Sequence, residues 1–159
     1  MKGTFLQIKK LLSGKWTGEG FAKFPTIEDT AYTEKFECIS DEYKDAIFFQ
    51  QKTWYKNDKE NNGHTVFWDT GFFILKNNEI LLLSVQVGGR IEEYILVEST
   101  PNTFIFNSYL ISNDPKSTKS QRLFTISFDT LHYELNMKTH DAGFQNHLKA
   151  DLKKILPND

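Results

Sequence analysis

The side chains best suited to chemistry in this chain of 159 residues are four histidines, His64, His132, His140 and His147. A neutral imidazole binds metal ions and exchanges a proton near neutral pH. His64 follows an Asn-Asn-Gly turn and is expected to be exposed, and His140 stands beside Asp141 in a loop, as surface pairs do. His132 falls in an expected strand and can face either way. Position alone therefore selects none of the four as a ligand.

Other patterns of catalytic residues are missing from the sequence. The glycines in residues 18–20 lack the further glycine and the helix of a dinucleotide site, and neither G-x-S-x-G nor H-E-x-x-H occurs. Glu92 and Glu93 are adjacent in an expected strand, so they point to opposite faces, and we interpret them as solvated surface charges. Cys38 is the single cysteine, which excludes an internal disulfide and a cysteine-rich zinc site.

Two kinds of secondary structure must position these side chains. Apolar residues at helical spacing predict a helix over residues 4–12, which Gly14 ends. The rest of the chain alternates between apolar and polar residues and predicts about ten strands, with the longest polar loop at residues 112–120. The expected strands are residues 16–24, 30–39, 46–55, 65–75, 79–87, 90–97, 103–111, 122–128, 131–137 and 144–155.

The connections between these strands are mostly of hairpin length, which favours an up-and-down antiparallel order. So many strands must close into a barrel or split into a sandwich to remove their edges, and no long crossover is visible. We therefore predict an all-β fold, an antiparallel up-and-down β-barrel of about ten strands, with the short N-terminal helix closing one end. Residues 1–159 would form a single domain, and a barrel of this size can hold one small ligand.

Charge and composition limit the partners. The net charge of -2 and the pI of about 6.1 argue against a protein that binds nucleic acid through phosphate contacts. The sequence has no polybasic anchor, no apolar stretch that could span a bilayer and no apolar signal-peptide core, and its lone cysteine favours a reducing compartment. We expect a cytoplasmic protein without a membrane partner. Two copies of the barrel could pair through one face without a recognisable sequence motif, so the sequence leaves open whether the protein is a homodimer.

Motifs spread along the chain resemble those of the nitrobindin family, haem-binding β-barrels similar in shape to lipocalins and fatty-acid-binding proteins. The G-x-W start is common among barrels that bind lipophilic molecules, but its combination with a matching C-terminal strand is specific. The matching segments are G-x-W-x-G-x-G at residues 14–20 with Phe24-Pro25-Thr26-Ile27, Q-x-T-W at 51–54, an E-S-G-F/Y-like segment at 69–72, G-x-x-E at 89–92, the R…L-x-Y-x-x-x-M pattern at Arg122, Leu131, Tyr133 and Met137, and H-L-x-A-x-L at 147–152.

This resemblance implies one ferric haem b per chain, with His147 as the proximal iron ligand. It also implies reversible binding of nitric oxide and isomerisation of peroxynitrite to nitrate. That reaction needs no side-chain general base, which agrees with the lack of a catalytic dyad. The haem propionates would need cations at the barrel mouth, for which Lys119 and Arg122 are candidates. Thr26 resembles a family residue near the haem pocket.

Two features depart from the family pattern. Phe67 stands where the family commonly has a distal-side histidine, two residues before the acidic position that is Asp69 here, so the distal side would be more apolar. Strand alternation also places His147 on the face opposite Leu148 and the other apolar residues of its strand. His147 then points out of the barrel unless it lies at a frayed strand start or a β-bulge resets the alternation.

Two alternatives remain open at this stage. The first is a carrier of a small lipophilic molecule, favoured by Phe67 and by aromatic residues of which some must line the barrel (Phe48, Phe49, Phe72, Phe73, Phe104 and Phe106). It predicts displacement of a fluorescent fatty acid without haem binding. The second is an interaction module with a filled core, which would bind neither ligand.

Overall fold

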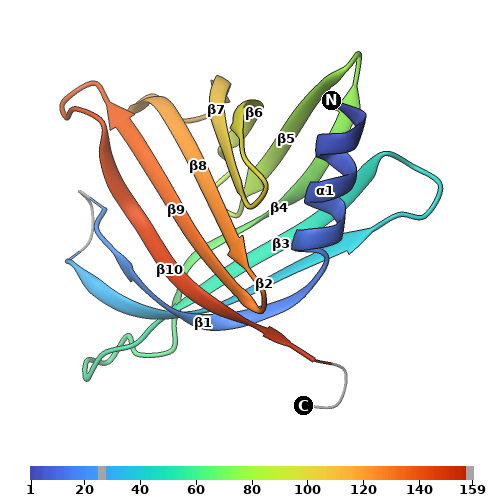
Figure 1. Ribbon diagram of the computed structural model, residues 1–159. Helices are drawn as coiled ribbons and strands as arrows, with labels where there is room; N and C mark the ends of the chain where they lie inside the picture. Colours follow the sequence, from blue (N-terminus) through green and yellow to red (C-terminus); the bar gives the residue numbers. More distant parts are fainter. Residues whose placement is uncertain (25–27, 157–159) are drawn as a thin grey trace.

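A computed structural model of the protein describes residues 1–24 and 28–156 (Figure 1). One helix precedes a series of strands that runs to the C-terminus. The elements are α1 (Lys2–Leu12), β1 (Gly14–Ala22), β2 (Thr30–Ser40), β3 (Ala46–Tyr55), β4 (Thr65–Lys76), β5 (Glu79–Gln86), β6 (Ile91–Ser99), β7 (Thr103–Ser112), β8 (Ser117–Ser127), β9 (Thr130–Thr139) and β10 (Gln145–Ile155).

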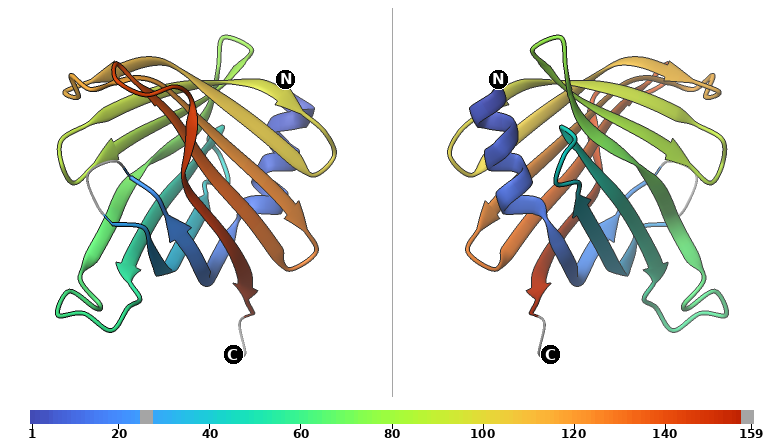
Figure 2. Two further views of the ribbon diagram at one scale, coloured as in Figure 1. Left: turned by 90° about the vertical axis from the view of Figure 1, so that its left-hand side faces the viewer. Right: turned by 90° about the vertical axis from the view of Figure 1, so that its right-hand side faces the viewer.

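The strands form a closed antiparallel barrel in which each strand pairs with its neighbours in sequence. Pairing of β1 with β10 closes the sheet, with Gly18 opposite Leu152 and Ala22 opposite Leu148. Figure 2 shows this barrel from two opposite sides. The first and last strands, β1 and β10, run side by side as an antiparallel pair. The up-and-down barrel of about ten strands predicted from alternation is confirmed.

Most element boundaries differ from the predicted ones by one or two residues, as in β1, which is Gly14–Ala22 rather than residues 16–24. Two further differences are at the helix and at the expected loop before β8. The helix begins at Lys2 rather than at residue 4. Most of the expected loop at residues 112–120 is strand, because β7 extends to Ser112 and β8 begins at Ser117. One of its polar residues, Ser120, faces the barrel interior. Its hydroxyl lies 2.8 Å from that of Tyr94, so the buried serine is hydrogen-bonded.

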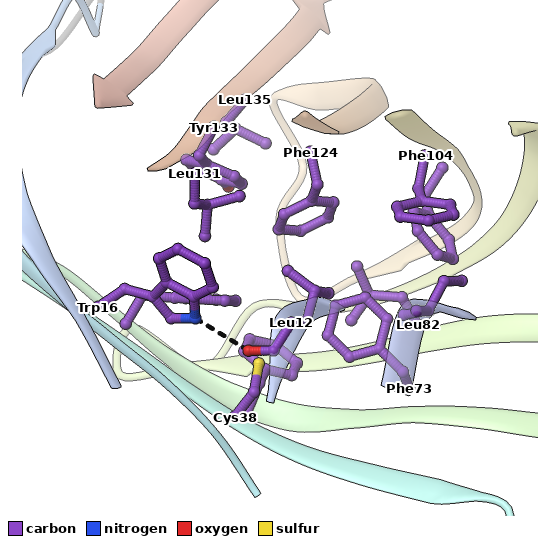
Figure 3. Packing of buried hydrophobic residues seen from close by; sticks show 14 of the residues in the cluster. Leu12, Trp16, Cys38, Phe73, Leu82, Phe104, Phe124, Leu131, Tyr133 and Leu135 are labelled. Carbon is purple, nitrogen blue, oxygen red and sulfur yellow. Dashed lines mark hydrogen bonds between the residues drawn. The ribbon is translucent and has the colours of Figure 1, made fainter. Parts of the chain in front are cut away.

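Helix α1 lies across one end of the barrel, which we call the helix end. Its apolar face buries Phe5, Ile8 and Leu12 completely. Side chains on its other faces bond the β2–β3 hairpin, through Lys2 and Asp45, and the β6–β7 hairpin. The indole nitrogen of Trp16 donates to the Leu12 carbonyl oxygen at 2.9 Å and so fixes the turn from α1 into β1 (Figure 3).

An aromatic core fills the barrel beneath α1. Phe73 makes edge-to-face contacts with Phe49, Phe106 and Phe124 at centroid distances of 5.4, 5.5 and 5.7 Å. Each aromatic side chain buried in this way contributes roughly 1.5–3 kcal/mol through removal of apolar surface from water. Of the phenylalanines expected in part to line the interior, Phe49, Phe73, Phe104 and Phe106 do so, whereas Phe48 and Phe72 pack against each other on the outer face.

The glycines of the G-x-W-x-G-x-G segment let β1 and β10 approach closely. A Cβ at Gly18 would overlap the backbone of Asp151, and one at Gly20 would overlap the Lys149 carbonyl and the ring of Tyr32. Glycine is therefore required at both positions by close packing rather than by an unusual dihedral angle. In the described part of the chain, no helix is long and apolar enough to cross a membrane.

Candidate functional site

A β-bulge at the start of β10 turns His147 into the barrel. The register with β9 shifts between Asn146, which faces Asn136, and Leu148, which faces Leu135. His147 and Leu148 are consequently both buried, although they are consecutive in a strand. The side-chain amide of Asn146 stabilises the bulge by donating to Asn136 Oδ1 and to the Leu148 carbonyl oxygen, both at 3.0 Å. The bulge is the condition under which His147 can face inward despite the apolar alternation.

The imidazole of His147 is buried, and it has no hydrogen-bond partner within residues 1–24 and 28–156. Only 2% of the residue is exposed, and among the described residues neither Nδ1 nor Nε2 has a partner. Burial, together with the positive charge of Arg90, lowers the pKa of His147 below its usual value. The ring is therefore neutral at physiological pH, with a nitrogen lone pair available to a metal. Buried polar groups are normally paired, so an unpaired imidazole calls for a ligand.

His147 lines a hollow of about 450 Å³ at the barrel end opposite α1, which we call the pocket end. This volume is within the range of about 300–1,000 Å³ that is typical of small-molecule sites. Two cations, Arg90 and Lys116, stand on its wall, and Arg90 Nη1 donates to Asp114 Oδ2 at 3.0 Å. The other lining residues are Phe24, Ser117, Met137, Thr139, Asp141 and Ala142.

Phe67 lies on the same side of the barrel interior as the hollow. It is 7% exposed, and its ring stacks on that of Phe24 with centroids 6.4 Å apart. Phe24 in turn meets the His147 ring edge-on at 5.1 Å. One phenyl ring therefore bridges the imidazole and the residue expected on the distal side. These two phenyl rings provide apolar surface next to His147.

The remaining candidate residues lie elsewhere. Lys119 is exposed and lines a different surface hollow with Lys138 and Phe144, away from His147. Arg122 is fully buried, so the expectation that it reaches the barrel mouth as a propionate partner is wrong. Thr26 lies outside the described residues. The cations that the structure brings to the hollow are Arg90 and Lys116, which sequence reasoning missed.

Arg122 is buried because it belongs to a layer of polar side chains across the barrel interior. We call this layer the polar belt; it consists of Glu34, Gln51, Asp69, Ser84, Glu92, Tyr94, Ser120, Arg122 and Tyr133. On β8 the inward residues run Ser120, Arg122 and Phe124 from the pocket end to the helix end. The belt therefore separates the hollow from the aromatic core.

The guanidinium of Arg122 holds the belt together. It lies 2.7 Å from Asp69 Oδ2 and 3.3 Å from Glu92 Oε2, and its Nε donates to the Tyr94 hydroxyl at 3.0 Å. Glu92 also lies 3.7 Å from Arg90, which joins the belt to the wall of the hollow. The interpretation of Glu92 as a surface charge is therefore wrong: the residue is 0% exposed.

Alternation along the strands carried the signal for this belt. Arg122 shares a strand face with Phe124, and Glu92 shares one with Tyr94 and Leu96, all of which are buried. The general rule that charged residues face solvent obscured that signal, because paired charges can be buried.

The other histidines are not part of the hollow. His64 is exposed, as predicted. His132 faces outward between Asp151 and Glu134, with Nδ1 and Nε2 at 2.8 and 3.0 Å from their carboxylate oxygens. Among residues 1–24 and 28–156, no group of three or more His, Cys, Asp or Glu side chains is arranged to hold a metal ion. A neutral, unpartnered imidazole beside an aromatic hollow with cations on its wall instead fits the axial ligand of a haem.

Comparison with known proteins agrees with this geometry. Residues 6–154 match a family model described as a THAP4-like, heme-binding beta-barrel domain. The chain belongs to this family, the nitrobindins. Membership of the nitrobindin family, predicted from the motifs at both ends of the chain, is thus confirmed.

Two curated relatives and one solved structure illustrate the match. A protein of Arabidopsis thaliana named peroxynitrite isomerase Rv2717c is 30% identical over 95% of this nitrobindin and 89% of its own length. A ferric nitrobindin-like protein of Saccharopolyspora erythraea is 23% identical over 91% of this chain and 71% of its own. The crystal structure of Rv2717c from M. tuberculosis has the same fold, with a TM-score of 0.78 at 23% identity over 96% of this chain and 98% of that one.

Proposed function

We propose that this nitrobindin binds one ferric haem b in the hollow at the pocket end, with His147 as its protein ligand. The observation that carries the proposal is the imidazole of His147, which is buried and lacks a partner among the described residues. A β-bulge directs this ring inward, and its low pKa keeps it neutral. An imidazole held in this state needs no deprotonation before it ligates iron.

The other residues of the hollow suit the rest of a porphyrin. Phe24, Met137 and Phe67 offer apolar surface for the ring and limit the access of water. Arg90 and Lys116 replace Lys119 and Arg122 as the cations for the propionates. Phe24 contacts the imidazole in the structure and would stand next to a ligand bound at His147.

We further propose that the bound haem handles nitric oxide and peroxynitrite and isomerises peroxynitrite to nitrate. When bound, ferric haem supplies a Lewis-acid iron with a position for a small nitrogen-oxide ligand. The 30% identical relative named as a peroxynitrite isomerase supports this activity. The apolar side chains of Phe24 and Phe67 would exclude water from that position, and the chain would need no general base.

A reducing, cytoplasmic setting belongs to the same proposal. Cys38 is the one cysteine of the sequence, and it is buried in the aromatic core. Burial raises the pKa of its thiol, which leaves it unreactive. A protein whose lone thiol serves only as core packing has no need of an oxidising compartment.

A carrier of a small lipophilic molecule is the second candidate function. The stacked rings of Phe24 and Phe67 favour it, because they make one side of the hollow apolar. In this case His147 would be a polar group at the wall rather than an iron ligand.

Titration of the apoprotein with ferric haem tests the proposal. We expect saturable 1:1 binding with a specific Soret band, which His147→Ala loses while His64→Ala, at an exposed position, retains it. Accelerated peroxynitrite decay by the loaded protein is the next measurement. A missing Soret band, or one that His147→Ala leaves unchanged, would overturn the haem proposal, and displacement of a fluorescent fatty acid would then favour the carrier.

A further inference from the structure

The polar belt contains more carboxyl groups than cations can neutralise. Glu34, Asp69 and Glu92 are at most 1% exposed, and Arg122 is the cation among them. Its guanidinium already contacts Asp69 Oδ2 at 2.7 Å and Glu92 Oε2 at 3.3 Å. Arg90 adds a second cation only at the Glu92 side of the belt. Neither of these two arginines is in direct contact with the carboxyl group of Glu34.

The hydrogen bond that Glu34 accepts comes from a neutral side chain. Glu34 Oε1 accepts a hydrogen bond from Gln51 Nε2 at 2.7 Å, and its Oε2 has no partner in the described part of the chain. No ion pair to Glu34 occurs there either. Gly18 lies opposite it on β1 and contributes no side chain. A fully buried carboxylate with one neutral donor pays a large desolvation cost, which protonation removes.

Other titratable groups surround Glu34 on several strands. Tyr32 precedes it on β2, Asp69 faces it from β4, Arg122 from β8 and Tyr133 from β9. Asp69 disfavours ionisation of Glu34, and Arg122 favours it. Arg122 directly contacts two other carboxylates, Asp69 and Glu92. It therefore affects the pKa of Glu34 less than burial does.

We propose that Glu34 is a buried proton-binding site beneath the hollow, which carries its proton at neutral pH because its carboxyl group is buried without a cation in contact. Burial, opposed by the Gln51 hydrogen bond and reinforced by Asp69, raises the pKa of Glu34 to about 8. Release of the proton adds one negative charge to the belt, which Glu92 and Arg90 connect to the wall of the hollow. The site does not require haem, so this proposal can be tested independently of the proposed function.

Infrared spectroscopy of the apoprotein detects the proton directly, through the carbonyl stretch of a protonated carboxylic acid. We expect this band in the wild type at neutral pH, with loss of one proton per chain as the pH rises through about 8. Glu34→Gln should lack the band. Glu37→Gln, which alters an outward glutamate on the same strand, should keep it. Absence of the band at neutral pH, or its persistence in Glu34→Gln, would overturn the proposal.

The pH dependence of folding provides a second, independent measurement. A carboxyl group whose pKa is raised from 4.5 to about 8 on folding contributes stability that is full below the lower value and is lost as the pH passes the upper one. Between these values, the folding equilibrium constant of the wild type should fall relative to that of Glu34→Gln by up to about tenfold per pH unit. Parallel stability profiles of the two proteins would contradict the inference.

Discussion

Two basic side chains inside this barrel have opposite surroundings. Arg122 contacts Asp69, Glu92 and the Tyr94 hydroxyl, whereas His147 has no partner among the described residues. Burial of an unpaired polar group is unfavourable, so it persists where a ligand completes it or where function requires it. Its ion pairs identify Arg122 as a structural residue, whereas the imidazole of His147, unpaired within the described part of the chain, is the candidate ligand-binding group.

Removal of Arg122 should therefore destabilise the protein far more than removal of His147. Arg122→Met leaves the buried carboxylates of Asp69 and Glu92 without their cation, which we expect to cost about 3–5 kcal/mol. Adding Asp69→Asn to this variant should recover part of the loss, because one uncompensated charge disappears. Urea unfolding monitored by circular dichroism measures both effects. A cost below about 1 kcal/mol for Arg122→Met would show that the belt is not an ion-paired unit.

His132 on the outer face offers a pH-dependent contribution of known sign. Although partial burial favours its neutral form, hydrogen bonds to Glu134 and Asp151 raise the pKa of His132. Its contribution to stability is therefore full below the unfolded pKa and is lost as the pH rises through the folded value. Since the ring is about a third exposed, we expect at most about 1 kcal/mol. Thermal unfolding of His132→Gln should differ from the wild type more at pH 6 than at pH 9, and His64→Gln is the control. A difference that grows with pH would contradict this assignment.

At the scale of the strand, one inserted residue decides the direction of the candidate ligand. Regular alternation over residues 147–152 would place His147 outside, because Leu148, Ala150 and Leu152 face inward. The bulge between Asn146 and Leu148 lets both His147 and Leu148 point into the barrel. The bulge thereby supplies the site, and Asn146 stabilises it through its side-chain amide.

Deletion of Asn146 should remove the site without removing the barrel. The strand would return to regular alternation, with Leu148 kept inside by its apolar side chain and His147 turned to solvent. We expect loss of the haem Soret band with a retained β-sheet circular dichroism spectrum. Asn146→Ala, which keeps the residue count but removes the amide hydrogen bonds, should weaken haem binding only in part. Undiminished haem binding by the deletion variant would show that the bulge does not direct His147.

These strands also show what the sequence could and could not predict. Alternation and turn residues sufficed for the barrel because each hairpin is a local feature, as at residues 128–129 between β8 and β9. The direction of His147 could not be derived, since a bulge is defined by the pairing with β9 and not by β10 alone. The pairing of Arg122 with Asp69 and Glu92 joins β8 to β4 and β6, and such contacts across a barrel leave no local pattern.

At the scale of the whole molecule, the interior divides into three levels. The aromatic core beneath α1 occupies the helix end, the polar belt crosses the middle, and the hollow with His147 lies at the pocket end. Figure 3 shows the first level, where Phe73, Phe124 and Trp16 point toward one another around Leu12. The aromatic residues beneath α1 do not line the hollow, although the hydrophobic cluster extends to it through Phe24 and Met137. Substitutions at the two ends of the barrel should therefore affect stability and ligand binding to different degrees.

Two matched phenylalanine variants test this division. Phe124→Ala opens a cavity in the core, where Phe124 contacts Phe36, Phe73 and Tyr133, and we expect a loss of about 3–5 kcal/mol in stability with haem affinity per folded molecule unchanged. Phe24→Ala removes a half-buried ring at the hollow, so its cost in stability should be smaller while haem affinity falls. Urea unfolding and haem titration of both variants separate the two quantities. If Phe124→Ala weakened haem binding as strongly as Phe24→Ala, the belt would have to transmit strain from the core to the hollow, and the two ends of the barrel would form one cooperative unit.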